Sequence, residues 1–191
     1  MTSPSILSDY KIVIVVDDGV QAVDVVSRAK GFVPQLLEYN DSLSLYFTGG
    51  RNPVHNIKTA TDFNNLVVPR PSGDRSLAQT LQDVISEYRD QKHSVYVFTA
   101  AAEEARVDVS QVIKDHADDL TNKHREQAFA GFQFFQVGNA KGATTFLKKL
   151  DSKKKSGFSR DIVDTLEANQ ISSQPNKALI GSLSELDQDS E

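Results

Sequence analysis

The stretch that decides the fold is Lys11-Ile12-Val13-Ile14-Val15-Val16-Asp17-Asp18-Gly19. Its β-branched apolar residues lead directly into two carboxylates and a glycine. This pattern is typical of a strand that is buried on both faces and ends at a functional edge of a sheet. Ligands of open α/β sheets bind at the carboxyl ends of the strands. The sequence therefore predicts a site beside Asp17 and Asp18.

Outward from this strand, segments with a strand pattern alternate with segments with a helix pattern. Helices are expected over 22–37, with a kink or break at Pro34, and over 77–88, 107–120, 143–150 and 177–186. Further strands are expected over 42–48, 94–99, 132–137 and 161–164. The connection 51–73 is expected to hold only a short helical turn near 60–66. This alternation predicts an α/β fold with a doubly wound, mainly parallel central sheet flanked by helices on both faces, which is Rossmann-like.

The 191 residues, of which 39% are apolar and 25% charged, are enough for one well-buried core. We expect a flexible N-terminus over 1–9, a single domain over 10–186 and a frayed acidic C-terminus over 187–191. Alternation along 132–137 places Phe132 and Phe134 on one face of that strand and Phe135 on the other. These rings are therefore expected in the core.

Composition excludes several classes of function. The net charge of -5 argues against nucleic acid as a partner. Because the chain contains no cysteine, it has no disulfide, no thiolate metal site and no cysteine nucleophile. The first ten residues lack the pattern of a signal peptide, and no apolar run is long enough to span a bilayer. We therefore expect a cytoplasmic protein with no membrane span.

Several motifs follow one another in a recognisable order. They are Ile14-Val15-Val16-Asp17-Asp18, the helix 81–88, the strand 95–99, Phe132-Gln133-Phe134-Phe135-Gln136-Val137-Gly138-Asn139, the helix 143–151, Arg160-Asp161-Ile162-Val163-Asp164-Thr165 and Leu179-Ile180-Gly181. In order and spacing, from Tyr10 to about Leu186, the chain resembles the von Willebrand factor A (vWA) domain, in particular its fungal-type stand-alone group. The resemblance implies a doubly wound sheet and a protein-binding function.

The same resemblance implies where a metal would lie. Domains of this family hold a divalent cation at a metal-ion-dependent adhesion site, which leaves one coordination position for an acidic group of the partner. The site combines an Asp-x-Ser-x-Ser motif after the first strand, a threonine from a middle loop and an aspartate after the fourth strand. In this chain Asp17 matches the first acid, but Gly19 and Gln21 stand at the two serine positions.

The other two metal positions also depart from the family pattern. Arg75 aligns near the threonine, with Ser76 or Asp74 as alternatives, and Ala100 stands in place of the second acid. Magnesium requires near-octahedral oxygen coordination, so we expect no retained metal and no cofactor. If Arg75 faces Asp17, its guanidinium would replace the cation with a fixed charge.

The resemblance thus implies a non-catalytic protein–protein interaction module with a degenerate adhesion site. The expected binding rim comprises Asp17, Asp18, Gly19, Gln21, Gly49, Gly50, Arg75, Ser76, Thr99 and Ala100, in loops that extend over 48–51 and 99–103. The partner would be another protein, with self-association left open, and binding through a different face is an open alternative. A second alternative is a metal-dependent module in which Asp17 and Asp18 keep the ion with water and an acid of the partner.

A third alternative comes from a different class. Val16-Asp17-Asp18 and Phe98-Thr99-Ala100 are similar to the acid pair and the switch threonine of phosphoacceptor receiver domains. Such domains also need an aspartate directly after their third strand. The second clear strand here ends instead in Tyr46-Phe47-Thr48-Gly49-Gly50.

The remaining polar groups suggest no catalytic site. The four histidines, His55, His93, His116 and His124, are expected at the surface because they lie in different segments without ligand spacing. No Gly-x-Ser-x-Gly motif supports a hydrolase. Gly49-Gly50 favours a turn. Lys148, Lys149 and 153–155 are expected to be a solvated helix end.

Overall fold

The segment 11–16 is an inner strand of the sheet in the computed structural model, which describes residues 3–19, 21–68, 75–102, 106–152 and 156–184. Within these residues the strands are β1 (Lys11–Val16), β2 (Leu43–Phe47), β3 (Val54–Ile57), β4 (His93–Thr99), β5 (Ala130–Gln136) and β6 (Val163–Glu167). The α-helices are α1 (Ala22–Leu37), α2 (Ala60–Leu66), α3 (Leu77–Tyr88), α4 (Val109–Asn122), α5 (Ala143–Asp151) and α7 (Pro175–Ile180). Short 3-10 helices are η1 (Pro4–Asp9), η3 (Gln127–Phe129), η4 (Ala168–Gln170) and η5 (Gly181–Leu183).

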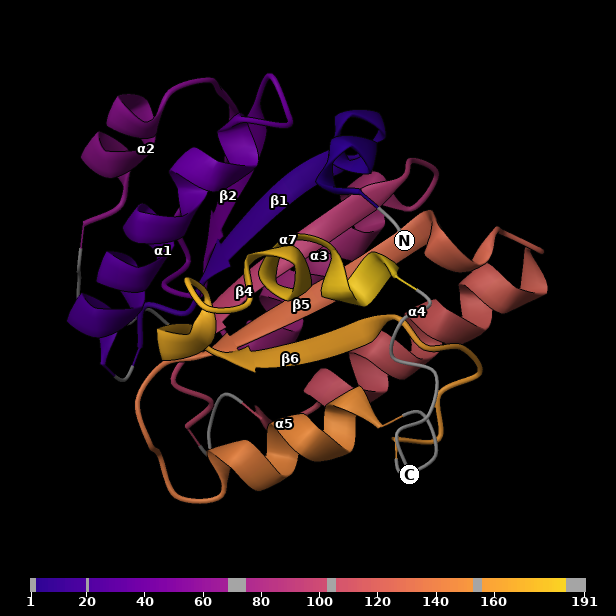
Figure 1. Ribbon diagram of the computed structural model, residues 1–191. Coiled ribbons are helices and arrows are strands. Elements are labelled where there is room, and N and C mark those ends of the chain that lie inside the picture. The colour runs from indigo at the N-terminus through magenta and orange to yellow at the C-terminus, as the bar shows by residue number, and fades with distance from the viewer. Residues whose placement is uncertain (1–2, 20, 69–74, 103–105, 153–155, 185–191) are drawn as a thin grey trace.

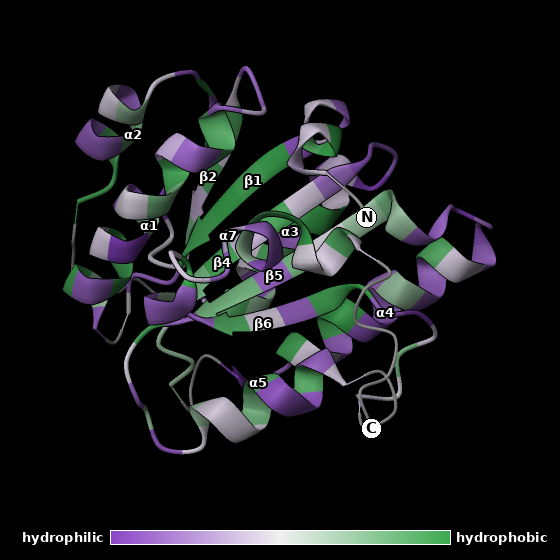
Figure 2. Cartoon of the chain, viewed as in Figure 1, coloured by the Kyte–Doolittle hydropathy of each residue, from purple (hydrophilic) through white to green (hydrophobic). Residues whose placement is uncertain are grey.

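The strands form one sheet in the order β3-β2-β1-β4-β5-β6 (Figure 1). Every neighbouring pair is parallel except β2 and β3, which are antiparallel. The predicted fold class is therefore confirmed: a doubly wound, mainly parallel sheet with helices around it. The parallel strands are buried almost throughout because helices cover both faces, and this explains the continuous apolar sequence of β1 in Figure 2.

Two apolar cores separate the sheet from its helical layers. One lies under α1, α2, α7 and the short N-terminal helix η1, and the other lies under α3, α4 and α5. Phe135 belongs to the first core, whereas Phe132 and Phe134 belong to the second. The assignment of these rings to opposite faces of one strand is confirmed.

Some element predictions were wrong. Strand β3 lies in the connection where only a helical turn was expected; that turn is α2, whereas β3 gives no strand pattern because His55 and Asn56 are exposed. Helix α1 continues through Pro34 without a break. The part of 1–9 that the structure describes forms η1, whose Leu7 is fully buried, so this segment packs on the core. The last helical segment is α7 followed by η5.

The expectation of surface histidines was also wrong for two of the four. His93 and His116 are 0% and 3% exposed, and their ring centroids lie 5.3 Å apart. His93 begins a strand that is covered on both faces, and His116 lies on the apolar stripe of α4 between Ile113 and Leu120. Burial lowers the pKa of both imidazoles, that of His116 to about 3.

Candidate functional site

The carboxyl ends of β2, β1 and β4 lie at the same level of the sheet. Val16 is in register with Phe47 on one side and with Phe98 on the other. The next residue of each strand is therefore brought into one row, which consists of Thr48, Asp17 and Thr99. The Asp17 main-chain N–H donates to Phe98 O at 2.9 Å, which continues the ladder to this row.

Asp17 accepts hydrogen bonds from the hydroxyls on both sides of it. Thr99 Oγ1 lies 2.5 Å from Asp17 Oδ2, and Thr48 Oγ1 lies 3.1 Å from Asp17 Oδ1. Thr99 Oγ1 in turn accepts from the main-chain N–H of Ala101 at 2.8 Å. Burial raises the pKa of Asp17, and the two threonine hydroxyls offset part of this rise because they stabilise the ionised form.

Asp18 is fully buried and its carboxylate pairs with an arginine from the next strand end. Arg51 Nη2 lies 2.6 Å from Asp18 Oδ2, and the Gly49 main-chain N–H donates to Asp18 Oδ1 at 2.7 Å. The guanidinium of Arg51 stacks on Phe47, with its carbon 3.3 Å from the ring centroid. Arg51 is thus held by an ion pair and by an aromatic face at once.

Thr48 connects the two carboxylates. Its Oγ1 accepts from the Asp18 main-chain N–H at 3.1 Å and lies 3.1 Å from both Asp17 Oδ1 and Asp18 Oδ1. A hydroxyl has a single proton to donate, so it is shared between these two oxygens. Each of the four carboxylate oxygens therefore has a protein donor within hydrogen-bond distance. A divalent cation would have to compete with these donors for every one of them.

Arg75 does not face Asp17, which corrects the pairing expected from the sequence. Its guanidinium forms an ion pair with Asp83, in the second turn of α3. Ser76 caps the same helix: Ser76 Oγ accepts from the Gln79 N–H at 3.2 Å, and the Gln79 side chain accepts from the Ser76 N–H at 2.9 Å. Both residues are engaged along α3. The fixed positive charge beside the acid pair comes from Arg51 instead.

The loops on the other side of the acid pair also contact one another. Gln21 adopts a left-handed conformation and places its side-chain oxygen against Gly138, where an added Cβ would lie 2.0 Å from it. Arg106 donates to Ala101 O at 2.8 Å and to Lys141 O at 2.5 Å. These contacts connect the loops that follow β1, β4 and β5. Ala100 lies beside Thr99 and is 1% exposed.

The structure therefore brings part of the predicted rim together. Asp17, Asp18, Gly49 and Thr99 form one hydrogen-bonded group with Thr48 and Arg51, while Gly19, Gly50 and Ala100 lie next to its members in the chain. Gln21 contacts the loop after β5, and Arg75 and Ser76 belong to α3. Asp74, Glu103 and the lysines 153–155 lie outside the described residues. In the part of the chain that is described, no group of three or more His, Asp or Glu side chains could hold a metal ion.

The pairing of Arg51 with Asp18 was the main feature that sequence reasoning missed. The signal was present: strands 11–16 and 42–48 were both expected to end at the same edge of a parallel sheet, so charges that follow them should meet there.

Among the described residues, no helix is both long and apolar enough to cross a membrane. A comparison with protein-family models found no match, and a comparison with curated protein sequences found none either.

Proposed function

We propose that this chain is a non-catalytic protein–protein interaction module of the vWA type whose adhesion site works without a metal ion. The single observation that carries the proposal is the Arg51–Asp18 ion pair at the carboxyl edge of the sheet, with Nη2 and Oδ2 2.6 Å apart. An internal guanidinium supplies there the positive charge that a cation would supply in a metal-dependent domain. The doubly wound sheet supports the vWA resemblance at the level of fold class only.

The closed hydrogen-bond network disfavours the two alternatives from the sequence. A metal-dependent module needs carboxylate oxygens that can coordinate an ion, and a receiver-like phosphoacceptor needs one that can attack a phosphoryl group. At Asp17 and Asp18 all four oxygens already accept from Thr48, Thr99, Gly49 or Arg51. A cation or a phosphoryl group would have to share each oxygen with a donor that the fold already provides.

The proposal is tested by affinity capture from cell extract on the immobilised chain, with and without a chelator. We expect the same partner protein to be retained at the same level under both conditions. Loss of the partner on chelation, with recovery on adding magnesium, would favour the metal-dependent alternative. Incorporation of phosphate from a small phosphodonor into the wild type but not into Asp17→Asn would favour the receiver-like alternative.

A further inference from the structure

Among the residues that the structure describes, strand β6 forms an edge of the sheet. It pairs with β5 on one side, in unbroken register from Phe132 and Val163 to Gln136 and Glu167. The Phe132 N–H donates to Ile162 O at 2.7 Å. In a parallel ladder, alternate residues of an edge strand bond to the neighbouring strand. Because Ile162 bonds to β5, the main-chain N–H and C=O groups of Val163, Thr165 and Glu167 point away from β5. Within the described ranges, none of these outward groups has a hydrogen-bond partner.

The opposite edge of the sheet is different. Strand β3 has four residues, its register with β2 shifts between Leu43 and Leu45, and Asn56 has a φ of 58°. Irregularities of this kind protect a sheet edge from pairing with another chain. β6 has neither a register shift nor a positive φ. It is therefore the edge that can accept another strand, at Thr165 and Glu167; Val163, which is 3% exposed, is not accessible.

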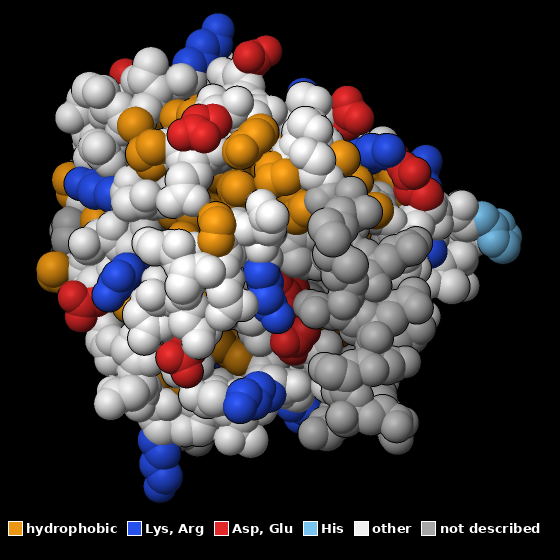
Figure 3. All heavy atoms as spheres, viewed as in Figure 1, with side chains coloured by type: hydrophobic (Ala, Val, Ile, Leu, Met, Phe, Trp, Pro, Cys, Tyr) orange, Lys and Arg blue, Asp and Glu red, His pale blue; other side chains and the backbone are white. Residues whose placement is uncertain are grey.

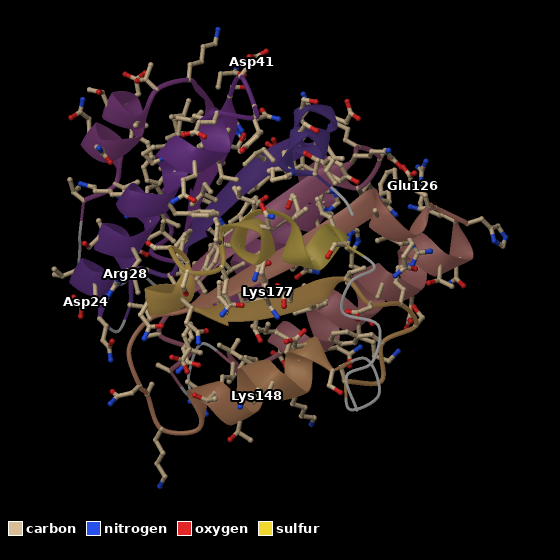
Figure 4. All side chains as sticks on the ribbon, in the orientation of Figure 1. Asp24, Arg28, Asp41, Glu126, Lys148 and Lys177 are labelled. Carbon is tan, nitrogen blue, oxygen red and sulfur yellow. The ribbon has the colours of Figure 1, made fainter. Side chains whose placement is uncertain are left out.

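A hollow of about 210 Å³ adjoins the carboxyl end of this edge. Leu147 of α5 and Leu166 of β6 provide its apolar walls, and Lys148, Glu167, Gln136 and Gln170 provide its polar rim. Figure 3 shows this face hollowed between the positions of β6 and α5, with hydrophobic side chains recessed in it. Figure 4 labels Lys148 on α5 and Lys177 on α7, on either side of β6. The volume is large enough for a medium-sized side chain.

The charges at the rim of the hollow determine which functional group a bound side chain should carry. Lys148 offers a donor and Glu167 an acceptor, and neither forms an ion pair with any residue in the described ranges. A carboxamide can place its oxygen toward an ammonium group and its NH2 toward a carboxylate. A carboxylate or an ammonium group would match one of the two rim charges and oppose the other. The aliphatic stem of a glutamine would contact Leu147 and Leu166.

We propose that β6 is a docking edge for an extended peptide segment of a partner protein, which adds a strand beside Thr165 and places a glutamine side chain in the hollow. Main-chain hydrogen bonds to Thr165 and Glu167 provide the affinity, and the hollow provides the specificity. This inference rests on the proposed interaction function and names the surface and the chemistry of its partner.

The test uses a display library of random peptides of about ten residues, selected on the wild-type chain and on Thr165→Pro. Proline removes the outward N–H of Thr165, which the ladder with β5 does not use, so an edge strand tolerates it. Thr165→Val is the matched control, because it loses the same hydroxyl, which donates to Asp151, but keeps the N–H. Thermal unfolding confirms that each variant is folded.

We expect enriched peptides to share a glutamine and to bind Thr165→Pro about tenfold more weakly than Thr165→Val. N-methylation of peptide amides on the edge facing β6 should abolish binding, whereas N-methylation on the opposite edge should not. Peptides that bind Thr165→Pro and Thr165→Val equally would overturn the docking edge. An enriched lysine or glutamate at the anchor position would overturn the carboxamide assignment.

A second pair of variants tests the hollow itself and leaves the main-chain hydrogen bonds of β6 unchanged. Lys148→Glu should weaken the selected peptides, whereas Lys149→Glu, in the same turn of α5 but not lining the hollow, should not. A wild-type dimer that Thr165→Pro dissociates would identify a second copy as the occupant and overturn the peptide assignment. In the capture experiment, a chelator-insensitive partner held equally by Thr165→Pro would overturn the docking edge while leaving the proposed function intact.

Discussion

Asp18 is fully buried, and its ion pair with Arg51 compensates the cost of burying its carboxylate. A buried ionised group costs several kcal/mol unless a partner and further hydrogen bonds compensate it. Here Arg51 Nη2 and the Gly49 N–H both donate to the Asp18 carboxylate, at 2.6 Å and 2.7 Å. The Arg51–Asp18 ion pair therefore stabilises the fold and also forms part of the candidate site.

Arg51→Met should destabilise the chain because it leaves the Asp18 carboxylate without its ion-pair partner. We expect the free energy of unfolding to fall by about 2–4 kcal/mol, measured by urea denaturation at neutral pH. Asp18→Asn in the same background should recover part of this loss, since the uncompensated charge is then absent.

Arg75→Met is the matched control for this change. Its ion pair with Asp83 joins two half-exposed side chains, so its loss should change stability by about 0–1 kcal/mol. Equal effects of the two arginine variants would contradict the assignment of Arg51 as the partner of the acid pair.

Asp17 should titrate above the ordinary range of an aspartate, because burial raises its pKa. The pKa is raised in the folded state only, so the ionised form opposes folding, and this residue's contribution to stability falls as pH rises through the folded-state value. Thr99→Val removes a donor to the carboxylate and should raise the pKa further. Carboxyl ¹³C shifts in an NMR titration measure both effects, and a midpoint below the ordinary value would contradict them.

The buried pair His93 and His116 should make the protein sensitive to acid. The folded-state pKa of each imidazole is lowered, while the unfolded chain takes up protons near 6.5. Below that pH the unfolded state binds more protons, so stability falls as pH drops toward the folded-state values. We expect His116 alone to account for a loss of about 1–2 kcal/mol between pH 6.5 and pH 5, and His93 to act in the same direction, measured by urea denaturation at each pH.

A variant pair separates this effect from general acid denaturation. His116→Leu should flatten the pH dependence, since one buried imidazole is then absent. His124→Asn, at an exposed position with a φ of 52° that asparagine tolerates, should leave the pH dependence unchanged. Parallel pH profiles for the wild type and His116→Leu would show that the buried pair has no such role.

At the scale of elements, the segment that contains α7 and η5 depends on a close approach at Gly181. A Cβ added there would lie 1.9 Å from Asp164 Oδ2 and 2.9 Å from Gln133 Oε1. Asp164 is itself held by Lys177, with Nζ and Oδ1 3.1 Å apart, so it has little room to move. Gly181→Ala should therefore lower the free energy of unfolding by about 1–3 kcal/mol and reduce the melting temperature.

Gly31 provides the matched control within a helix. It lies in α1 with no atom within 4 Å of an added Cβ. Gly31→Ala should stabilise the chain by about 0.5–1 kcal/mol, because alanine favours the helical backbone. A Gly181→Ala variant as stable as Gly31→Ala would contradict the tight docking of the C-terminal segment.

The sequence predicted the elements well where the apolar pattern was regular. The helices α1 and α3 and the strands β4 and β5 lie close to the expected ranges. β3 was missed because a short edge strand with exposed His55 and Asn56 has neither alternation nor an apolar run. The break at Pro34 was wrong because packing of Phe32, Val33 and Leu36 keeps that turn helical in spite of the missing N–H.

At the scale of the whole molecule, the position of the candidate site was predictable and its internal pairing was not. Because Asp17 and Asp18 directly follow strand 11–16, they were predicted at the carboxyl ends of the strands. Which residue would pair with Asp18 depended on the register of β2 with β1, which brings Thr48 and Arg51 to that edge. The alignment favoured Arg75, but its loop leads into α3 and its charge is used there.

We propose that Arg51 and the threonine hydroxyls replace a metal ion at the carboxyl ends of these strands. The most direct measurement is a calorimetric titration of the chelator-treated wild-type chain with manganese, a stand-in for magnesium. We expect no saturable binding up to about 1 mM manganese. Saturable binding with a dissociation constant below about 0.1 mM, lost in Asp17→Asn, would contradict it.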